Sequence, residues 1–339
     1  MQLRFDARAV IVTGAAQGIG RAIATAFRDA GARVHVADLD AAGVRQTAEA
    51  LGATAHALDL SERASAHRLV ADVAAAEGRL DILALAAGGV RGQVGRAIEE
   101  VSKADWRVLF EANVDGAFWL AQAAAPLMKR AGWGRIVTIS SGAGLRPSLT
   151  GIQAYAAAKH ALVGLTKQLS WELAPHGVTV NSVAPGFVLS NPATQRQWQA
   201  YGPDGQKRLV DAIHAKRLGT PDDIAAATLF FASEPAAWIT GRCCPSMAAG
   251  REAPASPGEL ADSHKAGAQF PSPLWGRTDS AEGRARRGAP GMKHLTDEGL
   301  KVLQPQGPGL ADCLGLPLRL MDGGRASTDS PMPGAPLLA

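Results

Sequence analysis

Tyr155 and Lys159 form a pair whose residue types and spacing suggest chemistry. They lie four positions apart in YAAAKHALVGLTKQLSWEL, so on a helix both side chains would project from the same face. An ammonium group beside a phenol favours the phenolate and would lower the tyrosine pKa from about 10 toward neutral. Such a phenol is a general acid/base suited to moving a hydroxyl proton. The pair alone is weak evidence, because an ordinary surface helix explains most such pairs.

Two further polar residues make the pattern more specific. Ser141 lies fourteen residues before Tyr155, just past the apolar run RIVTIS, where its hydroxyl could hold a substrate oxygen. Asn113 lies farther upstream, in NVDGAF. We take Asn113, Ser141, Tyr155 and Lys159 together as the candidate catalytic residues.

A glycine-rich turn, TGAAQGIG, follows the first apolar run of the chain. Gly14, Gly18 and Gly20 would let the backbone turn tightly and approach a pyrophosphate. The helix that follows would offer free N–H groups and its positive dipole end to the same group. The turn therefore predicts a dinucleotide site.

Asp38 indicates which dinucleotide is bound. It ends the second apolar run, 18 residues after the last glycine, where a carboxylate would accept hydrogen bonds from ribose hydroxyls and repel the 2′-phosphate of NADP. Gln17 is neutral where a basic residue could have paired with that phosphate. We therefore expect NAD to be preferred over NADP. The alternative is that Asp38 only caps the next helix.

The elements that would position these residues are short apolar runs separated by helical stretches. A helical pattern follows the first run up to residue 30 and ends at Gly31. Runs that are apolar on both faces and spaced for crossover helices predict a parallel sheet covered by helices on both sides. Since crossovers are right-handed, the fold class is a doubly wound α/β Rossmann sheet, with ligands at the carboxyl ends of its strands. The expected strands are residues 8–13, 34–37, 53–58, 80–86, 135–140 and 178–183.

Composition excludes several other classes of protein. The 339 residues are 47% apolar and 19% charged, with a net charge of +4 and no long basic run, so nothing favours nucleic-acid binding. Cys243, Cys244 and Cys313 form neither a disulfide framework nor a metal-ligand pattern, which predicts no metal and a reducing, cytoplasmic setting. The N-terminus has no signal-peptide pattern, and no apolar run is long enough for a membrane span.

Residues 6–243 resemble the compact, single-domain type of short-chain dehydrogenase/reductase. The matching stretches are TGAAQGIG, DIL followed by AAG at residues 81–88, Asn113, Ser141, Tyr155-x-x-x-Lys159 and Pro185-Gly186. The resemblance implies NAD(P)-dependent oxidoreduction of a secondary alcohol/ketone pair by a homo-oligomer, a tetramer, that is similar to 3-oxoacyl reductases. Fold alone leaves the substrate open.

The resemblance also assigns roles to individual residues. Tyr155 would be the acid/base and Ser141 would orient the substrate oxygen. Lys159 would bind the nicotinamide ribose and tune Tyr155, and Asn113 would hold a water in the proton relay. The implied cofactor-binding residues are Gly14, Gln17, Gly18, Ile19, Gly20, Asp38, Asp59, Leu60, Ala87, Gly88, Tyr155, Lys159, Pro185, Gly186, Val188 and Ser190.

Three stretches depart from the family pattern or vary within it. Residues 85–88 read Leu-Ala-Ala-Gly where the family usually has Asn-Asn-Ala-Gly, which predicts a differently braced adenosine side. Ser190 stands where a threonine often touches the cofactor amide. Substrate choice should lie in residues 187–214, where Trp198 and Tyr201 would line an apolar pocket. Ordinary packing of a mobile lid explains these two aromatics equally well.

The pattern of the chain changes at residue 243. Residues 244–339 hold 12 of the 20 prolines, no isoleucine and a single valine, Val302. Such a segment can build little sheet, and its prolines interrupt helices. We therefore divide the chain into a catalytic domain, 1–243, and a tail, 244–339, that is expected to be irregular or disordered.

The start of the tail suggests a frame change. The family's last strand typically reads Val-Asp-Gly-Gly, whereas this chain has CCPSMAA. With the codons TGC TGC CCG TCG ATG GCG GC, the neighbouring frame reads CTG CCC GTC GAT GGC GGC, or Leu-Pro-Val-Asp-Gly-Gly. Our hypothesis is that one nucleotide is missing at codon 243 or 244. The rival is a genuine interaction tail. Loss of the strand would leave an unpaired sheet edge and a non-functional or merely cofactor-binding protein.

We expect sequencing of the DNA across codons 240–250 to show the missing base. An unambiguous frame through these codons would contradict the frameshift hypothesis and leave the interaction tail.

Overall fold

A computed structural model describes residues 3–147 and 151–246 of the chain. Its centre is one seven-stranded parallel sheet in the order β3-β2-β1-β4-β5-β6-β7. The chain order reverses between β1 and β4, which is the switch point of a doubly wound sheet. The Rossmann fold expected from the spacing of the apolar runs is confirmed. The strands are β1 (Ala9–Thr13), β2 (Arg33–Asp38), β3 (Thr54–Ala57), β4 (Ile82–Leu85), β5 (Gly134–Ile139), β6 (Val178–Pro185) and β7 (Cys243–Ser246).

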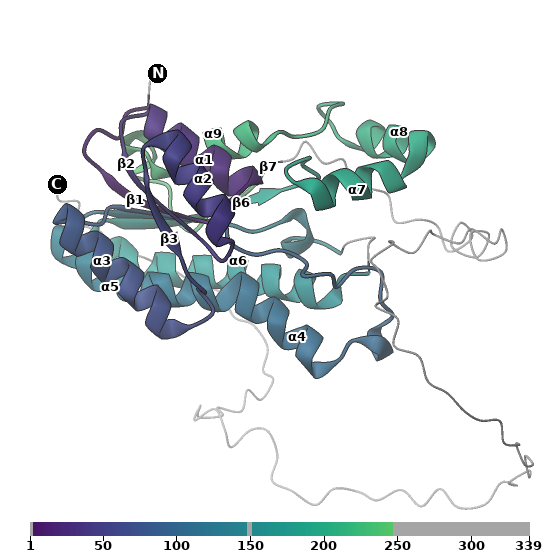
Figure 1. The fold of residues 1–339 in the computed structure, drawn as a ribbon, viewed down its shortest axis with the longest axis horizontal. Coiled ribbons are helices and arrows are strands. Elements are labelled where there is room, and N and C mark those ends of the chain that lie inside the picture. The colour runs from purple at the N-terminus through teal and green to yellow at the C-terminus, as the bar shows by residue number, and fades with distance from the viewer. Residues whose placement is uncertain (1–2, 148–150, 247–339) are drawn as a thin grey trace, which may run out of the picture. The chain divides into compact units, whose positions relative to one another are not determined.

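Helices cover both faces of the sheet (Figure 1). On one face α1 and α9 pack together, and on the other α3 packs on α5. The pair α7 and α8 lies side by side after β6 and outside these two layers. The helices are α1 (Gly18–Asp29), α2 (Ala41–Leu51), α3 (Arg63–Glu77), α4 (Lys103–Phe110), α5 (Gly116–Ala131), α6 (Gln153–Leu173), α7 (Pro192–Ala200), α8 (Gly202–Ala212) and α9 (Pro221–Ala232).

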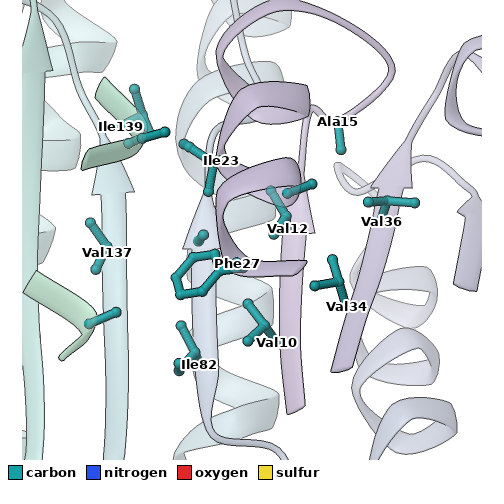
Figure 2. Close-up of a cluster of buried hydrophobic side chains, with 14 of the residues drawn as sticks. Val10, Val12, Ala15, Ile23, Phe27, Val34, Val36, Ile82, Val137 and Ile139 are labelled. Carbon is teal, nitrogen blue, oxygen red and sulfur yellow. The ribbon is translucent and has the colours of Figure 1, made fainter. Parts of the chain in front are cut away.

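The core consists of two apolar layers, one on each side of the sheet. Figure 2 shows the first layer, in which Ile23 and Phe27 of α1 lie over Val10 and Val12 of β1. Leu69 of α3 and Leu120 of α5 belong to the second layer. Strands that are buried on both faces need apolar residues at every position, which explains why their runs do not alternate.

The interpretation of residue 243 predicted that the sheet would stop at β6. In the structure the sheet continues with one more strand, β7. β7 pairs with β6 in parallel from Ser182 beside Cys243 to Pro185 beside Ser246. The expectation of an unpaired β6 edge is therefore wrong as far as Ser246. Pairing uses main-chain groups, and Pro245, which lacks an N–H, is tolerated on an edge strand. The rest of the proposed tail lies outside the described residues.

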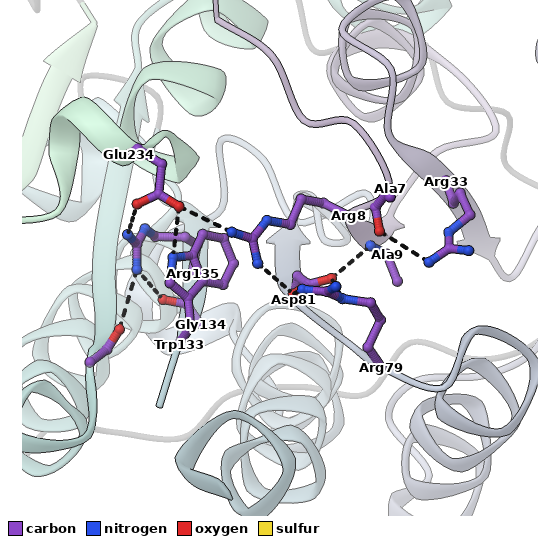
Figure 3. Close-up of polar contacts among 11 residues, drawn as sticks. Ala7, Arg8, Ala9, Arg33, Arg79, Asp81, Trp133, Gly134, Arg135 and Glu234 are labelled. Atoms are coloured by element: carbon purple, nitrogen blue, oxygen red, sulfur yellow. Dashed lines mark hydrogen bonds and ion pairs between the residues drawn. The ribbon is translucent and has the colours of Figure 1, made fainter. Parts of the chain in front are cut away.

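A polar network joins the amino-terminal ends of the strands, away from the edge that carries the candidate site (Figure 3). Arg135 of β5 is only 2% exposed, and burial lowers its pKa. Its guanidinium stacks on Trp133, 4.2 Å from the ring centroid, and pairs with Glu234 at 3.5 Å. Glu234 also accepts hydrogen bonds from Arg8 at 3.1 Å and from the Trp133 indole at 3.0 Å. One carboxylate thus ties the start of β1 and β5 to the segment after α9.

We predict that Glu234→Ala destabilises the domain by about 1–2 kcal/mol, because it leaves a buried guanidinium without its acidic partner. The value is below that of a fully buried pair because Glu234 itself is exposed and screened by solvent. Thermal unfolding would show a melting temperature lower by a few degrees. Glu172→Ala is the matched control, since among the described residues the hydrogen bond of Glu172 is to exposed Gln168 on the same helix. Equal losses in both variants would contradict a special role for the network.

The described part of the chain lacks two features that would point to other classes of site. Within residues 3–147 and 151–246, no helix is long and apolar enough to cross a membrane. The same residues include no cluster of three or more histidine, cysteine or acidic side chains that could hold a metal ion.

Candidate active site

Lys159 is a buried charged residue of the candidate site. It lies on α6 and is 3% exposed, and its ammonium donates a hydrogen bond to the carbonyl of Ile139 at 2.9 Å. The hydroxyl of Ser140 in turn donates to the Lys159 carbonyl at 3.1 Å. Burial lowers the pKa of Lys159 from 10.5 to about 8. These two bonds hold the middle of α6 against the end of β5.

Tyr155 and Ser141 are brought together by this arrangement. Ser141 lies two residues after the end of β5, and its hydroxyl is close enough to the Tyr155 phenol to lower the pKa of that phenol. The Lys159 ammonium lies 5.6 Å from the centroid of the tyrosine ring. Three of the four candidate catalytic residues therefore meet at the carboxyl end of β5.

The expected lowering of the Tyr155 pKa is not what the structure shows. Burial raises the pKa of Tyr155, and the hydrogen bond from Ser141 only partly opposes that effect. Lys159 does not offset the burial because its ammonium is directed to the Ile139 carbonyl rather than to the phenol oxygen. In the protein by itself, Tyr155 is therefore held in its protonated form.

Asn113 lies in a π-helical turn, η2 (Glu111–Asp115), between α4 and α5. It is 2% exposed, and its amide nitrogen donates to the carbonyls of Gly89 at 3.0 Å and Leu109 at 2.8 Å. Its amide oxygen accepts from the Gly89 N–H at 3.0 Å. The side chain thus braces the segment after β4, while the water-holding role stays a prediction. π-Turns are frequent at functional sites because they redirect a helix face.

The glycine-rich turn has the close backbone approaches that its sequence predicts. Gly14 has φ +67°, and a Cβ on it would lie 2.7 Å from the Ala86 carbonyl oxygen. Gly18 has φ +59°, and a Cβ there would lie 2.7 Å from the Ser190 carbonyl oxygen. Gln17 is the N-cap residue of α1 and makes no side-chain cap bond, and Ile19 packs on the core. The first N–H groups of α1 therefore remain available to an anion.

Asp38 does not cap the helix that follows it. That helix, α2, is capped by Asp40, which accepts hydrogen bonds from the N–H groups of Ala42 and Gly43. Asp38 instead accepts from the Ala16 N–H at 3.0 Å and from the Asp40 N–H at 3.0 Å. The carboxylate therefore stands at the end of β2, beside the glycine-rich turn, and the capping alternative is wrong.

The residues after β4 are held by hydrogen bonds from two neighbouring segments, while the differently braced adenosine side stays a prediction. The Ala87 N–H donates to the Thr13 hydroxyl at 3.1 Å. Gly88 has φ +143°, and a Cβ there would lie 2.4 Å from the Asn113 amide oxygen. Thr13 and Asn113 thus supply polar bonds where two asparagines are missing.

The other predicted cofactor residues lie along the same edge of the sheet. Asp59 follows β3 and accepts from the N–H and hydroxyl of Ser61, and Leu60 is buried against Gly116. Pro185 ends β6, followed by Gly186. Val188 is buried and bridges to Gly219. Ser190 approaches Gly18, so the stretch after β6 lies beside the glycine-rich turn. Within the described residues, no hydrogen bond links Asp59 to the candidate catalytic group.

The aromatics predicted for substrate choice form one cluster. Phe187 lies 6.0 Å from Trp198 and 5.8 Å from Tyr201, measured between ring centroids. Trp198 is on α7, and Tyr201 separates α7 from α8. Phe187 directly follows Pro185 and Gly186, the residues expected beside the nicotinamide, and this position fits a lid. Packing of the three rings against one another already accounts for the contacts of the cluster.

Sequence reasoning missed Thr13, Ser140 and Gln153, which bond to the candidate site without touching its chemistry. Thr13 ends β1 and Ser140 directly follows β5, so their place at the carboxyl edge was a usable signal. Gln153 lies two residues before Tyr155, and nothing in its type or spacing marks it. Its amide donates to the Arg96 carbonyl at 2.8 Å.

These residues fit a nicotinamide dinucleotide. Two glycines leave no room for a side chain where the backbone must approach a pyrophosphate, and free N–H groups point from the start of α1. Asp38 ends β2 beside the glycine-rich turn, where it could accept bonds from a ribose, and Tyr155 stands near Ser141 and Lys159 beside the strand ends, where it could transfer a proton. The arrangement can hold a dinucleotide along the sheet edge and move a proton at its nicotinamide end.

Comparison with known proteins agrees with this geometry. A family described as enoyl-(acyl carrier protein) reductase matches residues 14–245. D-threitol dehydrogenase of Mycolicibacterium smegmatis is 39% identical over 243 residues, 70% of this chain and 90% of that protein. The 3-oxoacyl-[acyl-carrier-protein] reductase of Salmonella typhimurium is 34% identical over 241 residues, 70% of this chain and 95% of that protein.

A solved structure supports the same assignment. A 7α-hydroxysteroid dehydrogenase complexed with NADH and 7-oxoglycochenodeoxycholic acid superimposes with a TM-score of 0.66 at 32% identity, covering 72% of this chain and 94% of that one. With the fold, the glycine-rich turn and the Ser141–Tyr155–Lys159 group, these matches establish the family. The chain belongs to the short-chain dehydrogenase/reductase family and is an NAD(P)-dependent oxidoreductase that acts on CH–OH groups.

Proposed function

We propose that the protein transfers hydride between NAD and a secondary alcohol/ketone pair, with Tyr155 as general acid/base. The observation that carries this proposal is that Ser141 and Tyr155 stand together at the carboxyl end of β5, with the buried Lys159 ammonium 5.6 Å from the centroid of the tyrosine ring. A phenol and a hydroxyl that meet at one point can hold the oxygen of a single substrate between them. The roles of these residues remain proposals.

Proton transfer follows from this geometry. Ser141 donates a hydrogen bond to the substrate oxygen and orients it toward the phenol. In the oxidation direction the Tyr155 oxygen, as phenolate, takes the hydroxyl proton, and in the reduction direction the phenol returns it. NAD, when bound, supplies the hydride acceptor. A positive charge near the phenol is needed for the oxidation direction, because burial alone holds Tyr155 protonated.

The proposed preference for NAD rests on Asp38. Its carboxylate lies at the end of β2 within hydrogen-bond distance of the turn that would hold the pyrophosphate. A 2′-phosphate placed there would meet a negative charge, whereas ribose hydroxyls would find an acceptor. Gln17, Gly18, Ile19, Gly20, Asp59, Leu60, Ala87, Gly88, Pro185, Gly186, Val188 and Ser190 complete the proposed cofactor site.

The relatives suggest probes for the substrate class. They include dehydrogenases named for D-threitol and galactitol and a reductase named for 3-oxoacyl thioesters. We propose a small-molecule alcohol or ketone of one of these kinds. Assembly as a tetramer, a cytoplasmic location and the division of the chain near residue 243 also stay predictions.

Tyr155→Phe should abolish turnover with every alcohol of this panel, because the ring stays and only the proton-transfer oxygen is lost. NADH binding, measured by fluorescence titration, should change by less than about twofold. Tyr201→Phe is the matched control, as it removes the other phenol of the chain and keeps its ring against Phe187. Turnover by Tyr155→Phe would overturn the role assigned to Tyr155. Tight NADH binding without turnover by the unaltered protein would favour a cofactor-binding protein.

Asp38→Ala should raise the affinity for NADPH relative to NADH, because it removes a negative charge that would repel the 2′-phosphate. The ratio of the two dissociation constants measures this directly and needs no substrate. Asp40→Ala is the matched control: it removes the cap of α2, costs about 1 kcal/mol of stability and should leave that ratio unchanged. A preference for NADPH in the unaltered protein would overturn this assignment of Asp38.

A further inference from the structure

The segment after β4, residues 89–96, borders the candidate site and needs to be held in place. Gly89, Gly92 and Gly95 all have positive φ values, of 139°, 77° and 69°. Glycines with such dihedrals give a segment much conformational freedom, so its shape depends on tethers from elsewhere. At its start, Gly89 is held on both its N–H and its carbonyl by Asn113.

Asp105, on the first turn of α4, holds the other end. Its carboxylate accepts hydrogen bonds from the Gln93 amide and, at 2.9 Å, from the Arg96 guanidinium. The same carboxylate closes a capping box with Ser102, and its pKa is lowered mainly by the hydrogen bond from the Ser102 hydroxyl. Asp105 therefore remains ionised at neutral pH and fixes the segment relative to α4.

Gln153 joins this segment to the helix that carries the proposed acid/base. It is the first residue of α6, and its amide donates to the Arg96 carbonyl at 2.8 Å. Gly151 packs next to Gly95, since a Cβ on Gly151 would lie 3.3 Å from the Gly95 Cα. The N-cap residue, Ile152, offers no side-chain cap. The Gln153 bond is thus a link between the segment after β4 and the first turn of α6, half a turn before Tyr155.

We propose that Gln153 is a positioning residue for the reaction: its bond to the Arg96 carbonyl, with Asp105 holding Arg96, sets where the start of α6 presents Tyr155 to the substrate. This inference rests on the proposed function of Tyr155. Lys159 fixes the middle of α6 to β5, whereas Gln153 fixes its first turn. Loss of the Gln153 bond would free the Tyr155 end of the helix and leave the Lys159 end anchored.

We expect the loss of the Gln153 bond to affect the reaction with the substrate and to spare cofactor binding. The glycine-rich turn, Asp38 and Lys159 do not bond to residues 89–96 in any hydrogen bond recorded for the described residues, so NADH binding should be spared. Displacement of an acid/base by even a fraction of an ångström weakens proton transfer, because catalysis depends on near-attack geometry. The loss of one hydrogen bond corresponds to about a tenfold change.

Two substitutions of Gln153 separate positioning from helix stability. Gln153→Ala removes the donor. Gln153→Glu also removes the donor but places an acid at the start of α6, which favours the helix through its dipole. Gln168→Ala is the matched control on the same helix, where an exposed glutamine donates to Glu172 and, within the part of the chain that the structure describes, to no other side chain. Each variant is made in the full chain and compared with the unaltered protein by kcat, KM, NADH affinity and hydrogen exchange.

We expect kcat/KM for the best alcohol of the panel to fall about tenfold in both Gln153 variants, with NADH affinity within about twofold and Gln168→Ala unaffected. Hydrogen exchange should speed up in residues 89–96 and in the first turn of α6, but not around Lys159. Full activity in Gln153→Glu would overturn the proposal, since it would show that only the helix end matters. Unchanged exchange in residues 89–96 would overturn it as well, even if no alcohol of the panel is turned over. Absence of turnover by the unaltered protein counts against the proposed function, not against the Gln153 link.

Discussion

The buried ammonium of Lys159 is the interaction on which the candidate site depends. A pKa lowered from 10.5 to about 8 means that holding this charge inside the domain costs about 3 kcal/mol, at roughly 1.4 kcal/mol per pH unit. The carbonyl of Ile139 offsets part of that cost, and the Ser140 bond returns from the strand to the helix. The result is a helix fixed to the end of β5 at the point where Ser141 and Tyr155 meet. Function and stability oppose each other at this residue, since an apolar side chain would pack there at lower cost.

The rest of the site is shaped by main-chain contacts more than by side chains. The glycine-rich turn approaches Ala86 on one side and Ser190 on the other, and Gly88 leaves no space beside Asn113. These approaches bring the segments after β1, β4 and β6 together at one edge of the sheet. A parallel sheet makes this possible because all its strands end on the same side. The charged side chains of the site, those of Asp38 and Lys159, therefore extend only a short distance from that edge.

The fold and most of the candidate site could be predicted from the sequence, for identifiable reasons. Buried parallel strands must be apolar at every position, so the runs around Val10, Ile82 and Val180 are visible without a structure. Tyr155 and Lys159 stand out by spacing, and Asp38 by its place at a strand end. The Tyr155 pKa was predicted wrongly because spacing says that two groups share a helix face, not where the ammonium points. Gln153 was missed because its partner is a main-chain carbonyl, which any residue supplies.

The edge strand β7 shows what kind of sequence change this architecture can absorb. Its ladder with β6 consists of main-chain bonds, and its residues Cys243 and Cys244 are only partly buried. A central strand could not accept arbitrary residues, since both of its faces lie in the core. An edge strand such as β7 therefore constrains residue identity less than a central strand does. A Rossmann domain can change its carboxyl-terminal sequence there while the inherited chemistry, encoded entirely upstream, stays unchanged.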